Sequence, residues 1–174
     1  MNILKNVRLR AAAKSLADVE IDESVWKPDF DIVDRYQCLG DELIKFGLLS
    51  FAGFGFLIQE ILPKGKPLPE TCTTLMLIAS LLIVGCVILA LFHRFNSTEC
   101  LYCQILIMRS LKRLENKHWS EIEIKQEKIF IEVTRVNQRK VSFSAHCCLV
   151  GSAISFAIGL LFTLFVFHNV LVRG

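Results

Sequence analysis

Two groups of cysteine and histidine are the residues of this chain whose types and spacing best suit chemistry. Cys100 and Cys103 stand in the spacing Cys-x-x-Cys, and His146 is followed directly by Cys147 and Cys148. If the two groups met, thiolates and the imidazole could surround a zinc ion. Neither group has Gly or Pro beside it to form the turns that usually carry zinc ligands. We therefore favour free thiols that fill gaps between helices, and we expect no bound metal.

No other catalytic pattern accompanies these residues. The chain contains no G-x-S-x-G or H-E-x-x-H motif and no glycine-rich phosphate loop. A thiol redox role for the Cys-x-x-Cys pair would need a surrounding βαβ pattern, which the sequence lacks. The net charge of +3 is too small to indicate a direct nucleic-acid site. We expect a protein that is not an enzyme and takes no cofactor.

Long uncharged segments must position these residues. Residues 71–92 form a run of 22 residues without a charged side chain, and as a helix they would extend roughly 33 Å. The hydrocarbon core of a bilayer is about 30 Å thick, so this segment is long enough to cross it. Residues 145–167 are also free of Asp, Glu, Lys and Arg. Both segments are predicted to be transmembrane helices in an all-α membrane protein.

A third transmembrane helix is predicted at residues 43–62, on weaker grounds. Only residues 46–58, thirteen in number, are free of charge or amide. Lys45 and Glu60 must therefore extend toward the two membrane interfaces. Residues 63–70 contain three of the four prolines and are predicted to be a short hairpin between the first two spans.

The distribution of basic residues predicts the orientation in the membrane. Six Lys or Arg precede the first span and ten lie in residues 93–144, whereas the 63–70 hairpin has two and the C-terminal tail one. Because basic segments stay on the cytoplasmic side, the N-terminus and residues 93–144 are expected inside and the tail outside. The expected location is the inner (cytoplasmic) membrane, as a multi-pass protein.

The predicted organisation has four parts: a cytoplasmic arm and helix at 1–42, a transmembrane hairpin at 43–92, a cytoplasmic basic hairpin at 93–144, and the last span with its short outer tail at 145–174. In the arm, Asp29 or Asp31 is expected to cap a helix after Pro28.

Within the basic hairpin, Asn96 or Ser97 is expected to cap one helix that ends near Lys117. Residues 121–136 alternate like a strand, yet a lone strand would have no partner, so a helix is favoured. The residues expected to bind a partner are Arg109, Lys112, Arg113, Lys117 and Trp119.

Small residues recur at helical spacing in two of the spans. Gly151, Ser155 and Gly159 lie four residues apart and share one face of the last span. Cys86 and Ala90 form a shorter version in the 71–92 segment. Such faces allow two helix backbones to approach closely. The partner helix is either in the same chain or in a second copy, and we expect homo-oligomers within the lipid bilayer.

The layout resembles the SLATT group of small membrane effectors linked with bacterial anti-phage systems. The corresponding segments, within about residues 30–117, are DRYQCLGDELIKFGLLSFAGFGFL, PKGKPLPE, residues 71–92, and HRFNSTECLYCQILIMRSLKRL. The last span is an addition to the two-span plan of that group. The resemblance implies an effector that damages the inner membrane when a sensor releases or assembles it. Membrane toxins of retron-type systems, which a reverse transcriptase complex restrains, are a variant of this idea.

Three functions follow as expectations. The first is an oligomerising transmembrane effector, or toxin, that permeabilises the inner membrane and is restrained by a cytoplasmic protein or ribonucleoprotein. The second is a non-enzymatic membrane anchor or adaptor that recruits a larger complex through residues 93–144. The third, a thiol or metal enzyme, would depend on Cys100 and Cys103.

Overall fold

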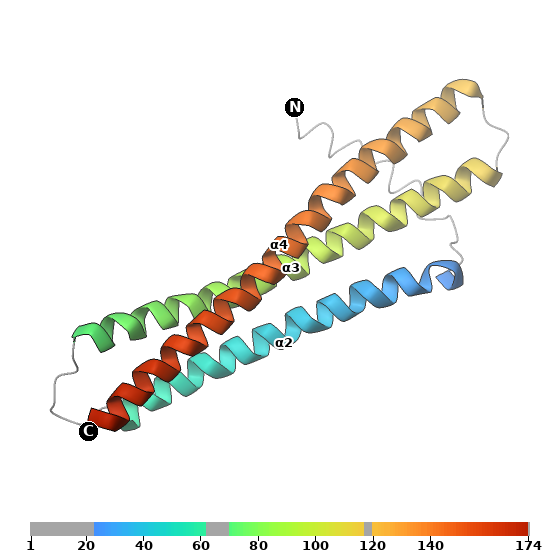
Figure 1. The fold of residues 1–174 in the computed structure, drawn as a ribbon. Coiled ribbons are helices and arrows are strands. Elements are labelled where there is room, and N and C mark those ends of the chain that lie inside the picture. The colour runs from blue at the N-terminus through green and yellow to red at the C-terminus, as the bar shows by residue number, and fades with distance from the viewer. Residues whose placement is uncertain (1–22, 62–69, 117–119, 174) are drawn as a thin grey trace. The chain divides into compact units, whose positions relative to one another are not determined.

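Three long helices make up the described part of the chain. A computed structural model describes residues 23–61, 70–116 and 120–173. They form α2 (Glu23–Ile61), α3 (Glu70–Asn116) and α4 (Glu121–Arg173), with no strand among these residues (Figure 1). The all-helical prediction is confirmed. It includes residues 121–136, whose alternating pattern left a strand as the other interpretation.

Each helix is longer than predicted from the sequence. α3 runs through Asn96 and Ser97, and Ser97 is buried, so neither residue caps a new helix. Between Gly85 and Gly151 the sequence contains no Gly or Pro, and nothing interrupts the backbone hydrogen bonds at either span boundary. α2 likewise begins at Glu23, so the expected caps at Asp29 or Asp31 are wrong.

α4 begins with a capping box that our sequence analysis overlooked. The Ser120 hydroxyl and backbone N–H donate to Glu123 Oε2 at 2.9 and 3.1 Å, and the Glu123 N–H donates back to Ser120 Oγ at 3.4 Å. This reciprocal pairing satisfies backbone donors that a helix start leaves unpaired. The spacing Ser-x-x-Glu is visible in the sequence and predicts this start.

Two of the helices are long and apolar enough to cross a membrane. They are α3 and α4, which contain the predicted 71–92 and 145–167 segments. The predicted third span at residues 43–62 is not supported by the described residues. Asp41, Glu42 and Lys45 lie at its start, and several side chains at its end fall outside the described ones.

The chain divides into two compact units, which we describe separately. We call Arg35–Phe95 with Ser144–Gly174 the apolar unit, and Met1–Asp34 with Asn96–Phe143 the charged unit. α2, α3 and α4 each contribute to both. Lys117, His118 and Trp119 lie outside the described residues.

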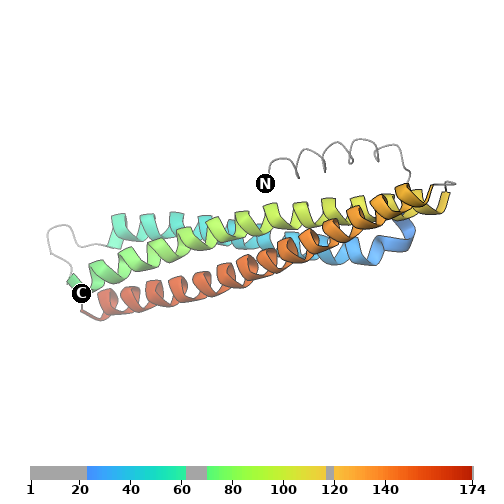
Figure 2. The ribbon, with the colours of Figure 1, turned by 90° about the horizontal axis from the view of Figure 1, so that it is seen from above.

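Two rows of mostly small residues at a seven-residue spacing lie in the interior of the apolar unit, beside larger buried residues such as Phe54 and Ile83. On α3 the buried row is Cys72, Ala79, Cys86 and His93. On α4 it is Ala145, Ser152, Gly159 and Val166. Figures 1 and 2 show α3 and α4 side by side here. A repeat of seven keeps one face of each helix on its neighbour, as in a coiled coil.

The charged unit also has a buried apolar interior. Leu106, Ile107 and Met108 of α3 and Ile131 of α4 are its buried aliphatic residues among those described. The Asn137 side-chain amide donates to Cys103 Sγ across the two helices, at 3.6 Å. Hydrophobic burial is thus the main stabilising contact of this unit.

Candidate functional site

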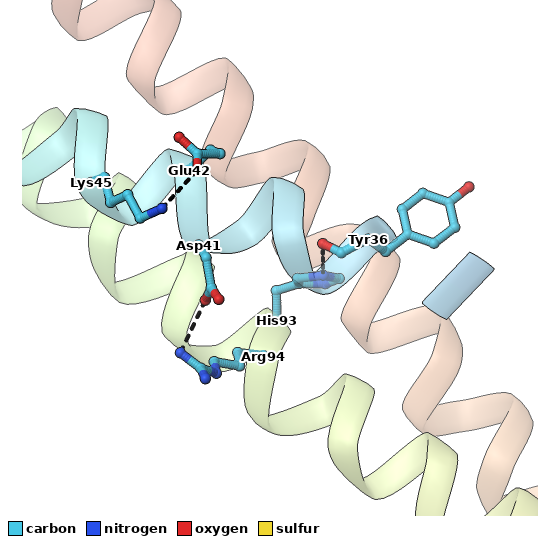
Figure 3. Close-up of polar contacts among 6 residues, drawn as sticks. All are labelled: Tyr36, Asp41, Glu42, Lys45, His93 and Arg94. Atoms are coloured by element: carbon cyan, nitrogen blue, oxygen red, sulfur yellow. Dashed lines mark hydrogen bonds and ion pairs between the residues drawn. The ribbon is translucent and has the colours of Figure 1, made fainter. Parts of the chain in front are cut away.

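One histidine connects all three helices of the apolar unit. His93 of α3 is only 3% exposed. Its Nδ1 lies 2.9 Å from the carbonyl oxygen of Ala145 on α4, and its Nε2 lies 3.1 Å from the carbonyl oxygen of Tyr36 on α2. Figure 3 shows the second of these contacts.

The imidazole fits because α2 has a glycine beside it. A Cβ atom at Gly40 would lie 3.0 Å from His93 Cδ2, and this distance is shorter than an ordinary van der Waals contact. Any larger residue would push α2 and α3 apart at this level. The absence of a side chain at Gly40 therefore allows the ring to reach the Tyr36 carbonyl.

Both contacts of the ring are to carbonyl oxygens, which only accept hydrogen bonds. A neutral imidazole donates through one of its two nitrogens, so the tautomer determines which carbonyl receives the hydrogen bond. Either way, the buried ring lies between backbone groups of two other helices.

Ion pairs flank the histidine. Arg94 Nη1 donates to Asp41 Oδ1 at 3.0 Å and so joins α3 to α2, while Lys45 Nζ donates to Glu42 Oε1 at 2.7 Å within α2 (Figure 3). All four side chains are at least partly exposed. Such pairs contribute at most about 1 kcal/mol each. We call His93, Tyr36, Asp41 and Arg94 the polar junction.

The predicted packing residues lie in the contact between α3 and α4 of one chain. Ser152 Oγ donates to the Cys86 carbonyl at 2.9 Å and lies 3.3 Å from Cys86 Sγ. Ser155 Oγ donates to the Leu82 carbonyl at 2.8 Å. These bonds hold the two helices together inside the apolar unit.

The remaining members of that set lie in the same contact. A Cβ at Gly151 would lie 3.4 Å from Leu89 Cδ1, and one at Gly159 would lie 3.2 Å from Ile83 Cγ1. Ala90 is fully buried and packs with Leu43 of α2 and Leu149 of α4. The face of α4 that carries the small residues is therefore occupied within the chain.

The three described residues of the set expected to bind a partner are only partly exposed. Arg109, Lys112 and Arg113 of α3 are each half-buried. The Arg109 Nε atom is fully buried. Lys117 and Trp119 lie outside the described residues, so partner binding by this set stays a prediction.

The cysteines of the two motifs lie in different units. Cys100 and Cys103 belong to the charged unit, and burial raises the pKa of both thiols. A thiol with a raised pKa is mostly protonated near neutral pH, which makes it a weaker nucleophile and ligand. His146 and Cys147 are exposed residues of the apolar unit. The described residues contain no group of three His, Cys, Asp or Glu that could hold a metal ion.

The polar junction is the feature that our sequence analysis missed. From the sequence, His93 is predicted only to begin the basic hairpin at residues 93–144. Its position seven residues from both Cys86 and Cys100 would have indicated the interior face of α3.

Comparisons of the chain with protein-family models, curated proteins and solved structures found no match. Its function is therefore argued from its own sequence and structure.

Proposed function

We propose that the apolar unit lies in a lipid bilayer. The supporting observation is the exposure of its apolar surface, since only 22% of the apolar stretch of α3, and equally of α4, is buried within the chain. An apolar helix in the core of a soluble protein would be mostly buried. Hydrocarbon solvates such side chains without cost, whereas water does not.

We include α2 in this membrane unit as a third span. Leu48, Leu49 and Phe56 of α2 are exposed, as are large apolar residues of α3 and α4. Its opposite face, at Leu43 and Gly47, is buried in the same unit. A helix with one packed face and one exposed apolar face suits the perimeter of a bundle in lipid. The positive-inside rule supports a cytoplasmic charged unit.

The function we propose is that of a membrane effector that permeabilises the bilayer when a cytoplasmic partner releases it. The layout resemblance to SLATT effectors supports this class. Ala79, Cys86 and Ala90 of α3 are fully buried, so α3 packs closely against its neighbours at these residues. Permeabilisation then requires α3 and α4 to separate, either to open one chain or to assemble several.

A reversible cross-link between α3 and α4 tests this mechanism. Ser152→Cys would place a thiol opposite Cys86, where the present Sγ–Oγ distance is 3.3 Å. We expect expression of the wild-type chain alone to depolarise bacteria and the purified protein to release dye from liposomes. Oxidised Ser152→Cys should release none until a reductant is added, and Ser152→Ala should leak regardless. Harmless expression, or equal leakage by the locked form, would contradict the proposal.

The membrane anchor or adaptor is the second candidate, and a specific observation favours it. Gly151, Ser155 and Gly159 are already used within the chain, which removes the sequence argument for self-association through that face. An adaptor predicts harmless expression and stoichiometric co-purification with a partner. The depolarisation experiment distinguishes the two functions.

A further inference from the structure

A regular row of large apolar side chains lies on the surface of the charged unit. Ile122, Ile129, Val136 and Phe143 of α4 are 71%, 56%, 44% and 72% exposed. They are spaced seven residues apart, which places them nearly in line along one side of the helix. We call these four residues the exposed row.

This row is distinct from the face by which α4 packs in the charged unit. Ile131 and Thr134 are buried, and Asn137 contacts Cys103 of α3. Four large apolar residues exposed at one spacing are unusual for a surface outside a membrane, where isolated ones are the norm. Over 21 residues the row extends roughly 32 Å, about six helical turns.

Basic residues flank the exposed row. Those exposed on its two sides are Lys125, Lys128, Arg135, Arg139 and Lys140. The exposed acidic residues beside the row are Glu121, Glu123 and Glu132, and Glu132 is 3.6 Å from Arg135. The surface is therefore an apolar line between mostly positive edges.

We propose that the exposed row binds an acidic amphipathic helix of another protein. Apolar residues of such a helix at a spacing of three and four would pack on the row, and Glu at its edges would pair with the flanking Lys and Arg. A second copy of this chain is a poor fit, because the mostly basic edges of the two copies would face each other. This proposal depends on one part of the proposed function, namely that residues 121–143 lie outside the bilayer.

A designed peptide provides the test. The probe is a fluorescein-labelled helix with Leu at heptad positions a and d and Glu at e and g, titrated against the full-length protein in zwitterionic nanodiscs. We expect saturable binding that weakens at least about tenfold in Ile129→Ser/Val136→Ser. Leu111→Ser, an exposed apolar residue of α3 in the same unit, is the matched control and should bind as the wild type does. A peptide with Lys in place of Glu should not bind.

Four outcomes would overturn the proposal: no saturable binding of the Glu peptide, equal binding by the double variant, displacement of the peptide by anionic lipid in the nanodisc, or a dimer that the double variant dissociates. The third would assign the surface to lipid and the fourth to a second copy. Circular dichroism of each variant shows whether it is folded. Since peptide binding is measured without depolarisation, this test and that of the proposed function fail independently.

Discussion

The apolar unit and the charged unit are built from the same helices, yet their interiors differ. In the apolar unit the buried rows of α3 and α4 consist mostly of small residues, such as Ala79, Cys86 and Ser152, and many large apolar side chains are exposed. Leu43, Phe54 and Ile83 are among the large apolar residues that are buried there. In the charged unit Leu106 and Ile131 are buried, and most of the exposed side chains of α4 are charged or polar.

The proposed location of the apolar unit in lipid would account for this difference. Water drives large apolar side chains inward, so the charged unit gains stability from the area that it buries. Lipid provides no such drive, and helices there associate through close backbone approach and hydrogen bonds. Gly159 and the Ser152 and Ser155 bonds provide both. Substitutions in each unit should therefore act through different mechanisms.

The largest effect is expected from a cavity in the charged unit. Leu106→Ala removes a buried aliphatic side chain and should lower the free energy of unfolding by about 3 kcal/mol. Ile129→Ala, on the exposed row, is the matched control and should change it little. Chemical denaturation in detergent measures both. Equal effects would show that the charged unit has no hydrophobic core.

In the apolar unit, we expect overpacking, rather than a cavity, to be the main way in which a substitution destabilises the protein. A Cβ at Gly47 would lie 2.6 Å from Val87 Cγ2, whereas one at Gly53 would have nothing within 4 Å. We expect Gly47→Leu to destabilise the protein by about 2 kcal/mol. Gly53→Leu should be tolerated, because its side chain would extend away from the other helices. If thermal unfolding in one detergent gives the same midpoint for both variants, α2 does not pack as described.

His93→Gln tests the polar junction. Glutamine donates through a single amide group and cannot satisfy the Tyr36 and Ala145 carbonyls in the same way, so we expect a loss of about 1.5 kcal/mol. His146→Gln, at an exposed histidine, is the matched control and should change the free energy of unfolding little. Thermal unfolding of both variants beside the wild type measures the two effects, and equal losses would refute the role assigned to His93.

A smaller effect is expected for Ser152→Ala. It removes the bond to the Cys86 carbonyl but leaves that oxygen its backbone partner in the helix. The expected loss is about 0.6 kcal/mol, the usual value for a side-chain hydrogen bond between membrane helices. Thermal unfolding of Ser152→Ala beside the wild type measures this loss of stability. A loss larger than that of His93→Gln would contradict the expected order of the two effects.

The smallest effect is expected in the rates of cysteine alkylation, which can be measured on the wild-type protein without any substitution. Burial raises the pKa of Cys100 and Cys103, so at a given pH a smaller fraction of each is the reactive thiolate. Iodoacetamide should therefore modify them more slowly than the exposed Cys38 at neutral pH. Their rates should rise as the pH increases toward the raised pKa values. Mass spectrometry of peptides follows each site.

Helix content and the two apolar segments were predictable from local sequence. Residues 71–92 and 145–167 lack charge over a length that suits a bilayer. Helix ends were less predictable, since a membrane boundary does not interrupt backbone hydrogen bonds where no Gly or Pro intervenes. The Ser120–Glu123 capping box is the exception and is visible as a motif.

The sequence by itself determined that this protein is helical and that its apolar residues exceed what its own interior can bury. Both properties depend on composition and periodicity within one segment. Only the tertiary structure decided that His93 reaches residues 52 and 57 positions away, and that Ser152 faces Cys86 across 66 positions. Such contacts depend on the register between helices, which small residues such as Gly40 and Gly159 permit by letting the backbones approach.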